Sequence, residues 1–433
     1  MIFLRLNLLC GNSDYYPHNP IKLGQFINFG KNMSYKYYPS GQTPVEILRI
    51  KIDSLSKPAV LSQAKSWLEK DGFHYLTTVN PEFVLSAKKD EEFFHLLNTS
   101  DLNVPDGFGL VLAAFFLGRK LHRYPGADLM FDLLDWAKKE KCPVGFIHWS
   151  KSHTSTQELS SALRARFPGL DFRICGAERG LDWSDADFVA FRPLLVFVSL
   201  GAPWQEKFIQ HYLCPLAFVR LAIGIGGAVD FLSGRVRRAP VLMRKLGLEW
   251  LWRLICQPRR IKRIFNATAV FFYRFLRWRF VQPFFHRPNV ACLLFKKEYG
   301  NYYILIFERV DEAGHWQIPQ GGRDGQEAGI AGLRELREEL NTKRFRLIRE
   351  WPEIHRYDFK TIPGRYGWRG QKQSLIVAEF LGRDQDIHLN DWEYRHWRWV
   401  KADDLVKAVH PLRQPGAAKF IARFQNLIEQ KII

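Results

Sequence analysis

Short apolar runs alternate with helical stretches between Phe73 and Gly224, and this alternation constrains the fold more than any other feature. The helical stretches include GADLMFDLLDWAKKE and PWQEKFIQHYL. Strands that alternate with helices form a mostly parallel sheet with helices on both faces. The ligand of such a domain binds at the carboxyl ends of the strands. The apolar runs are FHYLTTVN, DLNVP, PVGFIHW, LDFRIC, LLVFVSLG and FVRLAIG.

Polar and glycine residues follow several of these predicted strands directly. Thr78 and Asn80 end the first strand, and Pro81 opens a helix that we expect to continue through His95. Asp106 follows the second strand, GAPWQE follows LLVFVSL, and GIGGAVDFLSG follows FVRLAIG. Taken singly, each has a simpler interpretation, because Asp-Gly is common turn chemistry, Asn caps helices, and glycines make flexible loops.

Together, in this order and spacing, these stretches resemble the WecG/TagA/CpsF glycosyltransferase family over roughly residues 73 to 263. The stretches that match are TVNPEFVLSA, VPDGFGLV, PGADL, SLGAPWQEKFI and GIGGAVDFLSGRVRRAPVLMRKLGLEWLWRLICQPRRIKR. The resemblance implies a Rossmann-like domain that transfers an N-acetylmannosamine-type sugar with inversion and without a metal. The donor would be a UDP-sugar, and the acceptor N-acetylglucosamine linked to polyprenyl diphosphate.

The resemblance also assigns roles to residues. Asp106 would be the general base that takes the proton of the acceptor hydroxyl, with Thr78 and Asn80 beside it. Gly201, Gln205 and Glu206 would contact the nucleotide-sugar. The sequence departs from the family at His148-Trp149-Ser150-Lys151, where a glycine-rich turn is usual. The residues expected to offset diphosphate charge are Arg237, Arg238, Arg253, Arg259 and Arg260.

The stretch between Glu249 and Glu298 contains no acidic residue, although the chain carries 44 of them and a net charge of +19. Basic residues alternate there with aromatic residues, among them Phe271, Phe272, Phe275 and Trp278. This pattern predicts an interfacial helix on an anionic membrane. Its longest uncharged run, residues 264–273, is too short to span a bilayer. A core helix with a basic rim and a nucleic-acid-binding patch are the alternatives. By the resemblance, the family's carboxyl-terminal, membrane-docking appendage maps here.

Carboxylates converge further along the chain, in WQIPQGGRDGQEAGIAGLRELREELNT. On a helix from about Ala328, Glu335, Glu338 and Glu339 fall at spacings of three and four, and Arg334 can brace them. Such a glutamate-rich helix is often only a solvated face, but the preceding glycine turn argues against that interpretation. Converging carboxylates predict a site for a hard divalent cation.

This stretch resembles the Nudix box, and the likeness extends over residues 287 to 427. The stretches RPNV, RGQKQ and EYRHWRWV resemble the RNA pyrophosphohydrolase and dinucleoside-polyphosphate hydrolase branch. The resemblance implies an α/β/α domain that uses Mg²⁺ or Mn²⁺, with Glu335, Glu338 and Glu339 as catalytic metal ligands and Glu393 as a further ligand. Two departures concern the first glutamate of the box, replaced by Gln326 or shifted to Glu327, and the closing glycine, replaced by Asn341.

These observations predict a bifunctional enzyme with four segments: an irregular extension (1–45), a transferase domain (46–263), a membrane-docking linker (264–286) and a Nudix domain (287–433). Six cysteines without a CxxC pair favour reduced thiols in the cytosol, and the start of the chain lacks a signal-peptide cleavage site. We therefore expect a peripheral protein on the inner face of the cell membrane. Two alternatives stay open: a Nudix domain that only binds a regulatory nucleotide, or an RNA 5′ pyrophosphohydrolase whose basic stretch binds RNA.

Overall fold

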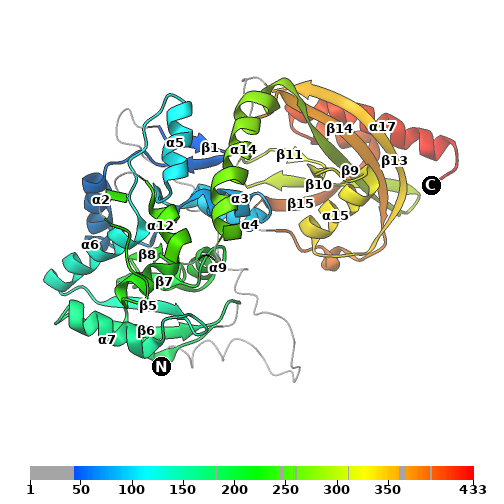
Figure 1. Cartoon of the computed structure of the whole chain (residues 1–433). Coiled ribbons are helices and arrows are strands. Elements are labelled where there is room, and N and C mark those ends of the chain that lie inside the picture. The colour runs from blue at the N-terminus through cyan, green and yellow to red at the C-terminus, as the bar shows by residue number, and fades with distance from the viewer. Residues whose placement is uncertain are drawn as a thin grey trace, which may run out of the picture.

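The computed structural model describes residues 43–433 except 181–182, 241, 244–246, 257, 259–260, 311, 360–366 and 391–392, and it leaves the side chain of Arg253 undescribed. The predicted extension over residues 1–45 therefore lies almost wholly outside the described residues. Two α/β units follow one another along the chain (Figure 1).

The first unit is built on a six-stranded sheet with the order β4-β3-β8-β7-β5-β6, in which every pairing is parallel. This confirms the fold class expected from the alternation of strands and helices. A small antiparallel hairpin precedes it, β1 (Val45–Ile47) and β2 (Ile50–Ile52). The strands of the sheet are β3 (His74–Val79), β4 (Leu102–Pro105), β5 (Val144–Trp149), β6 (Phe172–Ala177), β7 (Leu195–Ser199) and β8 (Leu221–Gly224).

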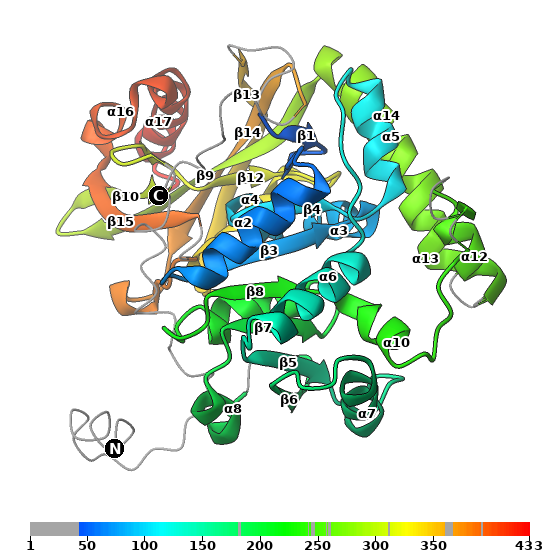
Figure 2. The same ribbon diagram turned by 90° about the vertical axis from the view of Figure 1, so that its left-hand side faces the viewer.

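Helices cover both faces of this sheet, and Figure 2 shows α2 and α6 together over one of them. One face carries α2 (Lys57–Glu69), α6 (Gly126–Lys139), α7 (Thr156–Arg166) and α10 (Val229–Leu232), whose apolar residues share one core. The other carries α8 (Ala186–Phe191), α9 (Trp204–Phe208) and the π-helical turn η2 (Ile209–Leu213). A third cluster joins the hairpin to α3 (Pro81–Ala87), α4 (Glu91–Thr99), α5 (Phe108–Phe116) and α14 (Phe271–Leu276).

The helix expected to run from Pro81 through His95 is divided into α3 and α4. The side chain of Asp90 accepts a hydrogen bond from the backbone of Phe93 at 3.0 Å and so caps a second helix. Asp90, Glu91 and Glu92 together form an N-terminal signal that competes with continuation of the first helix. Lys88, in the turn between the two helices, lies near enough to Asp324 and Arg287 of the second unit for their charges to act on it.

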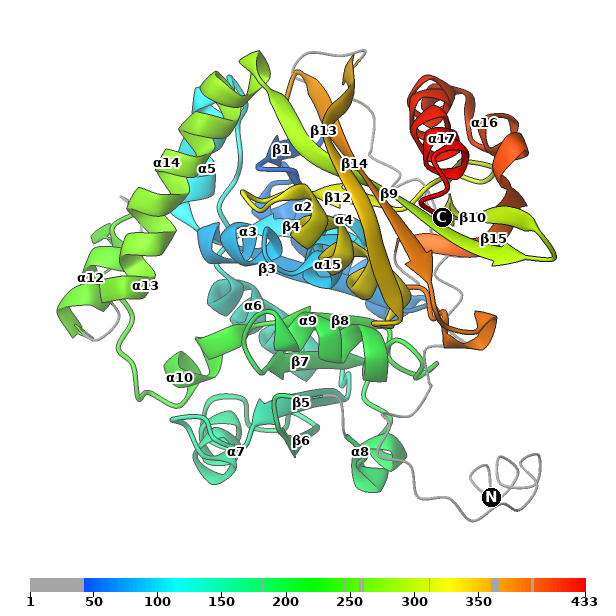
Figure 3. The same ribbon diagram turned by 90° about the vertical axis from the view of Figure 1, so that its right-hand side faces the viewer.

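A segment whose described residues are mostly helical joins the two units. It comprises α12 (Glu249–Cys256), α13 (Ile261–Phe265), η5 (Asn266–Val270), α14, η6 (Arg277–Val281) and η7 (Gln282–Phe284), and the chain then enters β9. Figure 3 shows α14 lying along α5.

The second unit has a seven-stranded sheet, mostly antiparallel, in which β14 pairs with β9 in parallel. Its helix α15 (Ala328–Leu340) packs on one face, while α16 (Leu405–Ala408) and α17 (Gln414–Glu429) pack on the other. This is the α/β/α arrangement that the sequence predicted. Its strands are β9 (His286–Glu298), β10 (Asn301–Arg309), β11 (Trp316–Gln317), β12 (Gln320–Gly322), β13 (Phe345–Asp358), β14 (Gly370–Phe380) and β15 (Tyr394–Lys401).

Candidate functional site

The candidate transferase residues follow four strands that are neighbours in the sheet, β4, β3, β8 and β7. Asp106 follows β4, Thr78 and Asn80 stand at the end of β3, and Gly201 comes two residues after β7. Because parallel strands end at the same edge, the structure brings these residues to one edge of the sheet.

Close contacts join the residues at this edge. The buried hydroxyl of Thr78 donates to the carbonyl of Gly224 at 3.0 Å. The amide oxygen of Gln205 accepts from the backbone N–H of Gly226, also at 3.0 Å. Gly224 itself has no room for a side chain, because a Cβ there would collide with Gln205 and Glu206. The two residues of the GAPWQE stretch thus lie directly against the glycine turn after β8.

Glu206 is the most perturbed titratable group at this edge. It is fully buried, and burial raises the pKa of its carboxyl to about 8, although a hydrogen bond from Gln205 at 2.6 Å opposes the shift. Its Oε2 has no hydrogen-bond partner among the residues that the structure describes. The buried hydroxyl of Tyr75 also lacks one, and desolvation together with the charge of Glu206 raises the pKa of that tyrosine. Burial at this edge therefore favours the protonated form of the Glu206 carboxyl more than exposure to solvent would.

Backbone hydrogen bonds hold Asp106 in place at both of its peptide groups. Its N–H donates to Val79 at 2.8 Å, and its carbonyl accepts from the guanidinium of Arg123 at 2.7 Å. Its side chain is half-buried. A Cβ on Gly107 would collide with Pro81 and would lie 3.4 Å from the Cβ of Asn80. The loop that carries Asp106 is therefore a neighbour of Asn80. The amide oxygen of Asn80 accepts from two N–H groups of α3, so Asn80 also serves as a helix cap.

The predicted diphosphate-binding arginines differ in their surroundings. Arg237 is exposed, whereas Arg238 forms an ion pair with Asp128 at 2.5 Å and lies 4.0 Å from Glu249. Arg259, Arg260 and the side chain of Arg253 lie outside the described residues.

The sequence analysis missed one cation at this edge, Arg179. Its Nε donates to the carbonyl of Leu200 at 2.7 Å, and its guanidinium lies 3.7 Å from the centre of the Trp149 ring. Its Nη2 also lies 3.2 Å from the position that a Cβ on Gly201 would occupy. The available signal was Trp149, in the stretch that departs from the family pattern.

The interpretation of residues 264–286 as a membrane-docking linker is wrong for its central aromatic rings. Phe271, Phe275 and Trp278 are buried in a core with apolar residues of α3 and α5, and Phe272 packs against it. These rings are buried because α14 packs against α3 and α5 and covers their apolar side chains. The exposed large apolar residues lie elsewhere on the same segment: Phe265, Tyr273, Leu276, Phe280, Val281, Phe284 and Phe285. Among the described residues, no helix is long and apolar enough to cross a bilayer.

The carboxylate cluster of the second unit lies on α15, as predicted. Arg334 binds Glu335 at 2.7 Å and Glu338 at 2.9 Å, so it braces both carboxylates. Glu335 packs against Gly321, where any side chain would collide with the carboxylate. Burial raises the pKa of Glu335 to about 8, and the guanidinium of Arg334 opposes the shift.

Glu339 and Glu393 complete this cluster. Glu339 is buried, and its Oε1 accepts from the hydroxyl of Tyr394 at 2.8 Å. Within the described part of the chain, its Oε2 has no hydrogen-bond partner. Burial, then the charges of Glu393 and Glu335, raise the pKa of Glu339 well above its usual value. A buried carboxylate oxygen without a donor, beside other carboxylates, fits a hard divalent cation. Glu335, Glu338, Glu339 and Glu393 could hold such an ion.

The two departures from the Nudix box have local explanations. The side chain of Gln326 accepts from Arg334 at 3.1 Å, whereas Glu327 makes no capping bond. Asn341 ends α15 in the left-handed conformation, with φ of 50°, as a closing glycine would. Glu350 of β13, which the sequence analysis missed, accepts from the backbone N–H of Gly329 and so caps the helix from a distant strand. No local sequence signal could have identified that contact.

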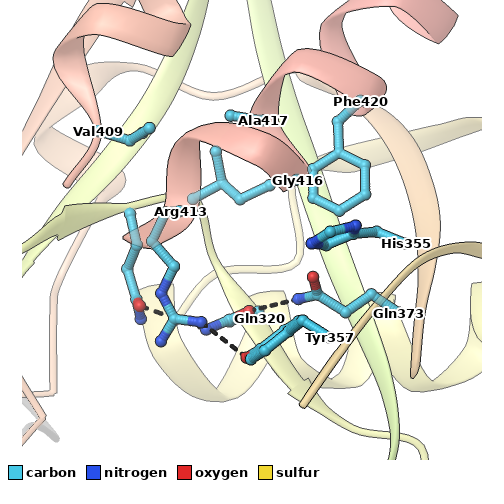
Figure 4. A pocket seen from close by; sticks show the side chains of 11 residues that line it. Gln320, His355, Tyr357, Gln373, Val409, Arg413, Gly416, Ala417 and Phe420 are labelled. Carbon is cyan, nitrogen blue, oxygen red and sulfur yellow. Dashed lines mark hydrogen bonds between the residues drawn. The ribbon is translucent and has the colours of Figure 1, made fainter. Parts of the chain in front are cut away.

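A pocket opens between the sheet of the second unit and α17 (Figure 4). The rings of His355 and Tyr357 stack at one wall, with centroids 5.6 Å apart. Gln373 donates to Gln320 at 2.8 Å, and Arg413 donates to the hydroxyl of Tyr357 at 3.0 Å. Aromatic rings beside amide groups suit a flat, hydrogen-bonding ligand such as a nucleobase.

A second group of possible metal ligands, Glu312, His315 and His410, lies apart from α15. Glu312 contacts His315 at 2.7 Å, and the two imidazole rings stack 4.1 Å apart with their planes 4° from parallel. The lone pairs of parallel rings lie in parallel planes and do not converge on one ion. This group therefore does not replace the predicted cluster.

Family models place these observations among known proteins. The model of the glycosyl transferase WecG/TagA/CpsF family matches residues 45–284. The chain belongs to the WecG/TagA/CpsF family. The model of the NUDIX domain matches residues 285–424, so this glycosyltransferase carries a Nudix hydrolase domain behind it. Both enzyme classes expected from the sequence are confirmed.

Two curated relatives of this WecG/TagA/CpsF glycosyltransferase bear the name N-acetylglucosaminyldiphosphoundecaprenol N-acetyl-beta-D-mannosaminyltransferase. The one from Bacillus subtilis (strain 168) is 36% identical over 225 residues, which is 48% of this chain and 85% of the relative. The one from Staphylococcus aureus (strain NCTC 8325 / PS 47) is 28% identical over 243 residues, which is 54% of this chain and 93% of the relative.

Solved structures similar to the chain align over about a third of it. A Caenorhabditis elegans Ap4A hydrolase binary complex is 20% identical and has a TM-score of 0.27, with 32% of this chain and 98% of that chain covered. The Escherichia coli dihydroneopterin triphosphate pyrophosphohydrolase is 16% identical, with a TM-score of 0.26 and coverage of 32% and 99%.

Proposed function

We propose that the transferase domain moves an N-acetylmannosamine-type sugar from a UDP donor to N-acetylglucosamine linked to polyprenyl diphosphate, in the synthesis of a cell-surface polysaccharide. The names of the curated relatives support this substrate pair. The observation that carries the proposal is the meeting of Thr78, Asp106, Gln205 and Glu206 around the ends of four adjacent strands.

In this proposal Asp106 is the general base. The acceptor hydroxyl attacks the anomeric carbon, its proton passes to the Asp106 carboxylate, and the bond to the UDP leaving group breaks with inversion. Thr78 and Asn80 line the acceptor side, while Gly201, Gln205 and Glu206 contact the donor. Arg237, Arg238, Arg253, Arg259 and Arg260 are the candidates for offsetting the diphosphate charge, and Arg179 joins them. No metal takes part in this step.

We also propose that the protein acts at the inner surface of the cell membrane, because its acceptor would be a lipid. Exposed apolar side chains on the joining helix support this, with Tyr273, Leu276 and Phe280 at spacings of three and four. Basic residues of the same segment, such as the exposed Lys262, would favour anionic lipids. The contact differs from the one predicted from sequence, because it uses the outward face of the helix.

For the Nudix domain we propose hydrolysis of a nucleoside diphosphate-linked substrate that depends on Mg²⁺ or Mn²⁺. When bound, such an ion polarises a phosphate and activates water. The side chains of Glu335, Glu338, Glu339 and Glu393 would hold it, and Arg334 fixes two of them in position. The pocket beside His355 and Tyr357 would receive the base of the nucleotide.

One set of assays tests both proposals on the full chain. Purified protein is incubated with UDP-N-acetylmannosamine and a polyprenyl-diphosphate-linked N-acetylglucosamine in the presence of EDTA, and release of UDP is followed. A panel of capped nucleotides, triphosphorylated nucleotides and nucleotide-sugars is then screened with Mg²⁺ or Mn²⁺. Failure to release UDP from any donor, or failure to hydrolyse any phosphoanhydride, would refute the corresponding half of the proposal.

A further inference from the structure

Basic residues from three parts of the chain gather where the transferase and Nudix domains adjoin. Lys88 is the C-cap of α3, Arg274 lies in α14, Arg277 begins η6, and Arg287 lies at the start of β9. Figure 3 shows α3 and α4 beside α15 and β12, with α14 running past them. Within the part of the chain that the structure describes, Lys88, Arg274 and Arg277 have no carboxylate within 4.0 Å.

These positive charges are close enough to disfavour one another. Desolvation and then the charge of Arg274 lower the pKa of the Lys88 ammonium, and Arg277 and Arg287 act in the same direction. The charge of Asp324 acts in the opposite direction and raises the pKa of Lys88. Glu91 is a second acidic residue where the two domains adjoin. A crowded set of cations becomes more favourable when an anion lies among them.

The cations lie next to the carboxylate cluster of the Nudix domain. Arg287 packs closely on Gly322, because a Cβ on Gly322 would lie only 2.5 Å from Nη2 of Arg287. The carbonyl of Gly322 accepts from Arg334 at 2.8 Å, and Arg334 binds Glu335 and Glu338. Glu91, three residues after Lys88, interacts with both Glu338 and Arg287. Ligand bound at the carboxylates would therefore extend toward Lys88.

We propose that Lys88, Arg274 and Arg277, together with Arg287, bind the phosphate groups of the Nudix substrate, so that the hydrolase site is shared between the two domains. The inference rests on the proposed hydrolysis of a nucleoside diphosphate-linked substrate. A polyphosphate chain carries charge on both sides of the scissile bond. Metal held by the glutamates offsets part of that charge, and guanidinium and ammonium groups offset the rest.

The test measures binding of inorganic tripolyphosphate to the full chain by calorimetry in metal-free buffer. The Lys88→Ala/Arg274→Ala/Arg277→Ala variant should bind at least about tenfold more weakly than wild type. Lys139→Ala, which removes an exposed lysine from α6, should bind like wild type. Lys88→Arg should retain binding where Lys88→Glu loses it. Circular dichroism and UDP release check that each variant is folded.

The outcomes separate this inference from the proposed hydrolysis. Wild-type affinity in the triple variant, or no tripolyphosphate binding by wild type, would overturn the shared site. A variant that loses binding to phosphatidylglycerol vesicles but keeps tripolyphosphate affinity would also overturn it, because the cations would then contact lipid. If wild type hydrolyses a nucleotide and the triple variant has the same KM, hydrolysis stands and the shared site fails. If tripolyphosphate binding is lost as expected but no nucleotide is hydrolysed, the phosphate site stands without the hydrolase.

Discussion

Arg123 and Glu249 form an ion pair of 2.8 Å between the loop that follows α5 and the first residue of α12. Both side chains are largely buried, with 19% and 10% of their surface exposed. The same guanidinium donates to the carbonyl of Asp106, so the joining helical segment is tied to the proposed catalytic base.

We expect Glu249→Gln to lower the free energy of unfolding by a few kcal/mol, on the order of 3, because it removes the negative charge that faces the largely buried guanidinium of Arg123. The rate of sugar transfer should fall as well, since the loop carrying Asp106 loses an anchor. Urea denaturation and UDP release measure the two effects. Glu158→Gln, which removes the charge of the exposed pair with Arg235, is the matched control and should change the free energy of unfolding much less. Equal effects in the two variants would contradict this account.

Asp106→Asn should abolish sugar transfer while leaving the fold intact. The amide keeps the shape of the side chain but cannot take the acceptor proton, and loss of a general base costs about a hundredfold or more in rate. The backbone hydrogen bonds of Asp106 do not depend on its side chain, so the melting temperature should change little. UDP release under single-turnover conditions is the measurement. Transfer at the wild-type rate would remove Asp106 from the role of base.

Glu206→Gln should make the stability of the protein less dependent on pH. In the folded protein the pKa of Glu206 is about 8, whereas an unperturbed glutamate has a pKa of 4.5. Between these two values the unfolded chain releases a proton that the folded protein retains, so stability falls as pH rises through the window. Denaturation curves at about pH 5 and about pH 8 should show a smaller loss in the variant, by on the order of a few kcal/mol. Parallel curves for both proteins would show that Glu206 ionises normally.

Glu338→Gln and Glu339→Gln should each suppress metal-dependent hydrolysis and leave sugar transfer unchanged. Glutamine keeps one oxygen but removes the negative charge on which affinity for a hard cation depends. Because Asp106 belongs to a separate domain, UDP release should persist in both variants. Glu429→Gln at the end of α17 serves as a control. Binding of Mn²⁺ measured by electron paramagnetic resonance gives a second readout, and undiminished Mn²⁺ affinity in both variants would contradict the assignment.

Replacing Tyr273, Leu276, Phe280 and Phe284 by serine should release the protein from anionic vesicles, because these exposed side chains would otherwise be buried in the lipid surface. High salt alone should only weaken binding, since it screens the basic residues and leaves the apolar contact. Flotation with phosphatidylglycerol vesicles is the measurement. Tyr299→Ser, at a fully exposed turn of the Nudix domain, should float like wild type. Flotation of the fourfold variant at the wild-type level would leave this helix face without a membrane role.

The sequence predicted what depends on local pattern and missed what depends on distant contacts. The parallel sheet, α15 and the left-handed Asn341 follow from periodicity and end signals, and each appears in the structure. The orientation of the joining helix could not be read in this way, because packing against distant elements such as α3 and α5 determines which of its aromatic residues are covered. The pairing of Arg123 with Glu249 spans 126 residues, and no spacing rule connects them.

The indole of Trp278 is shared by both domains. It is buried in the transferase core with Phe275. It also packs directly on Gly367 of the Nudix domain, where a Cβ would collide with the indole ring. The chain passes from that core to β9 through the rest of η6, through η7 and through the extended residue Phe285. Proteolysis or truncation at this junction therefore removes a core residue from one enzyme and a packing surface from the other. The two activities are thus expected to be inherited, lost and engineered as one unit.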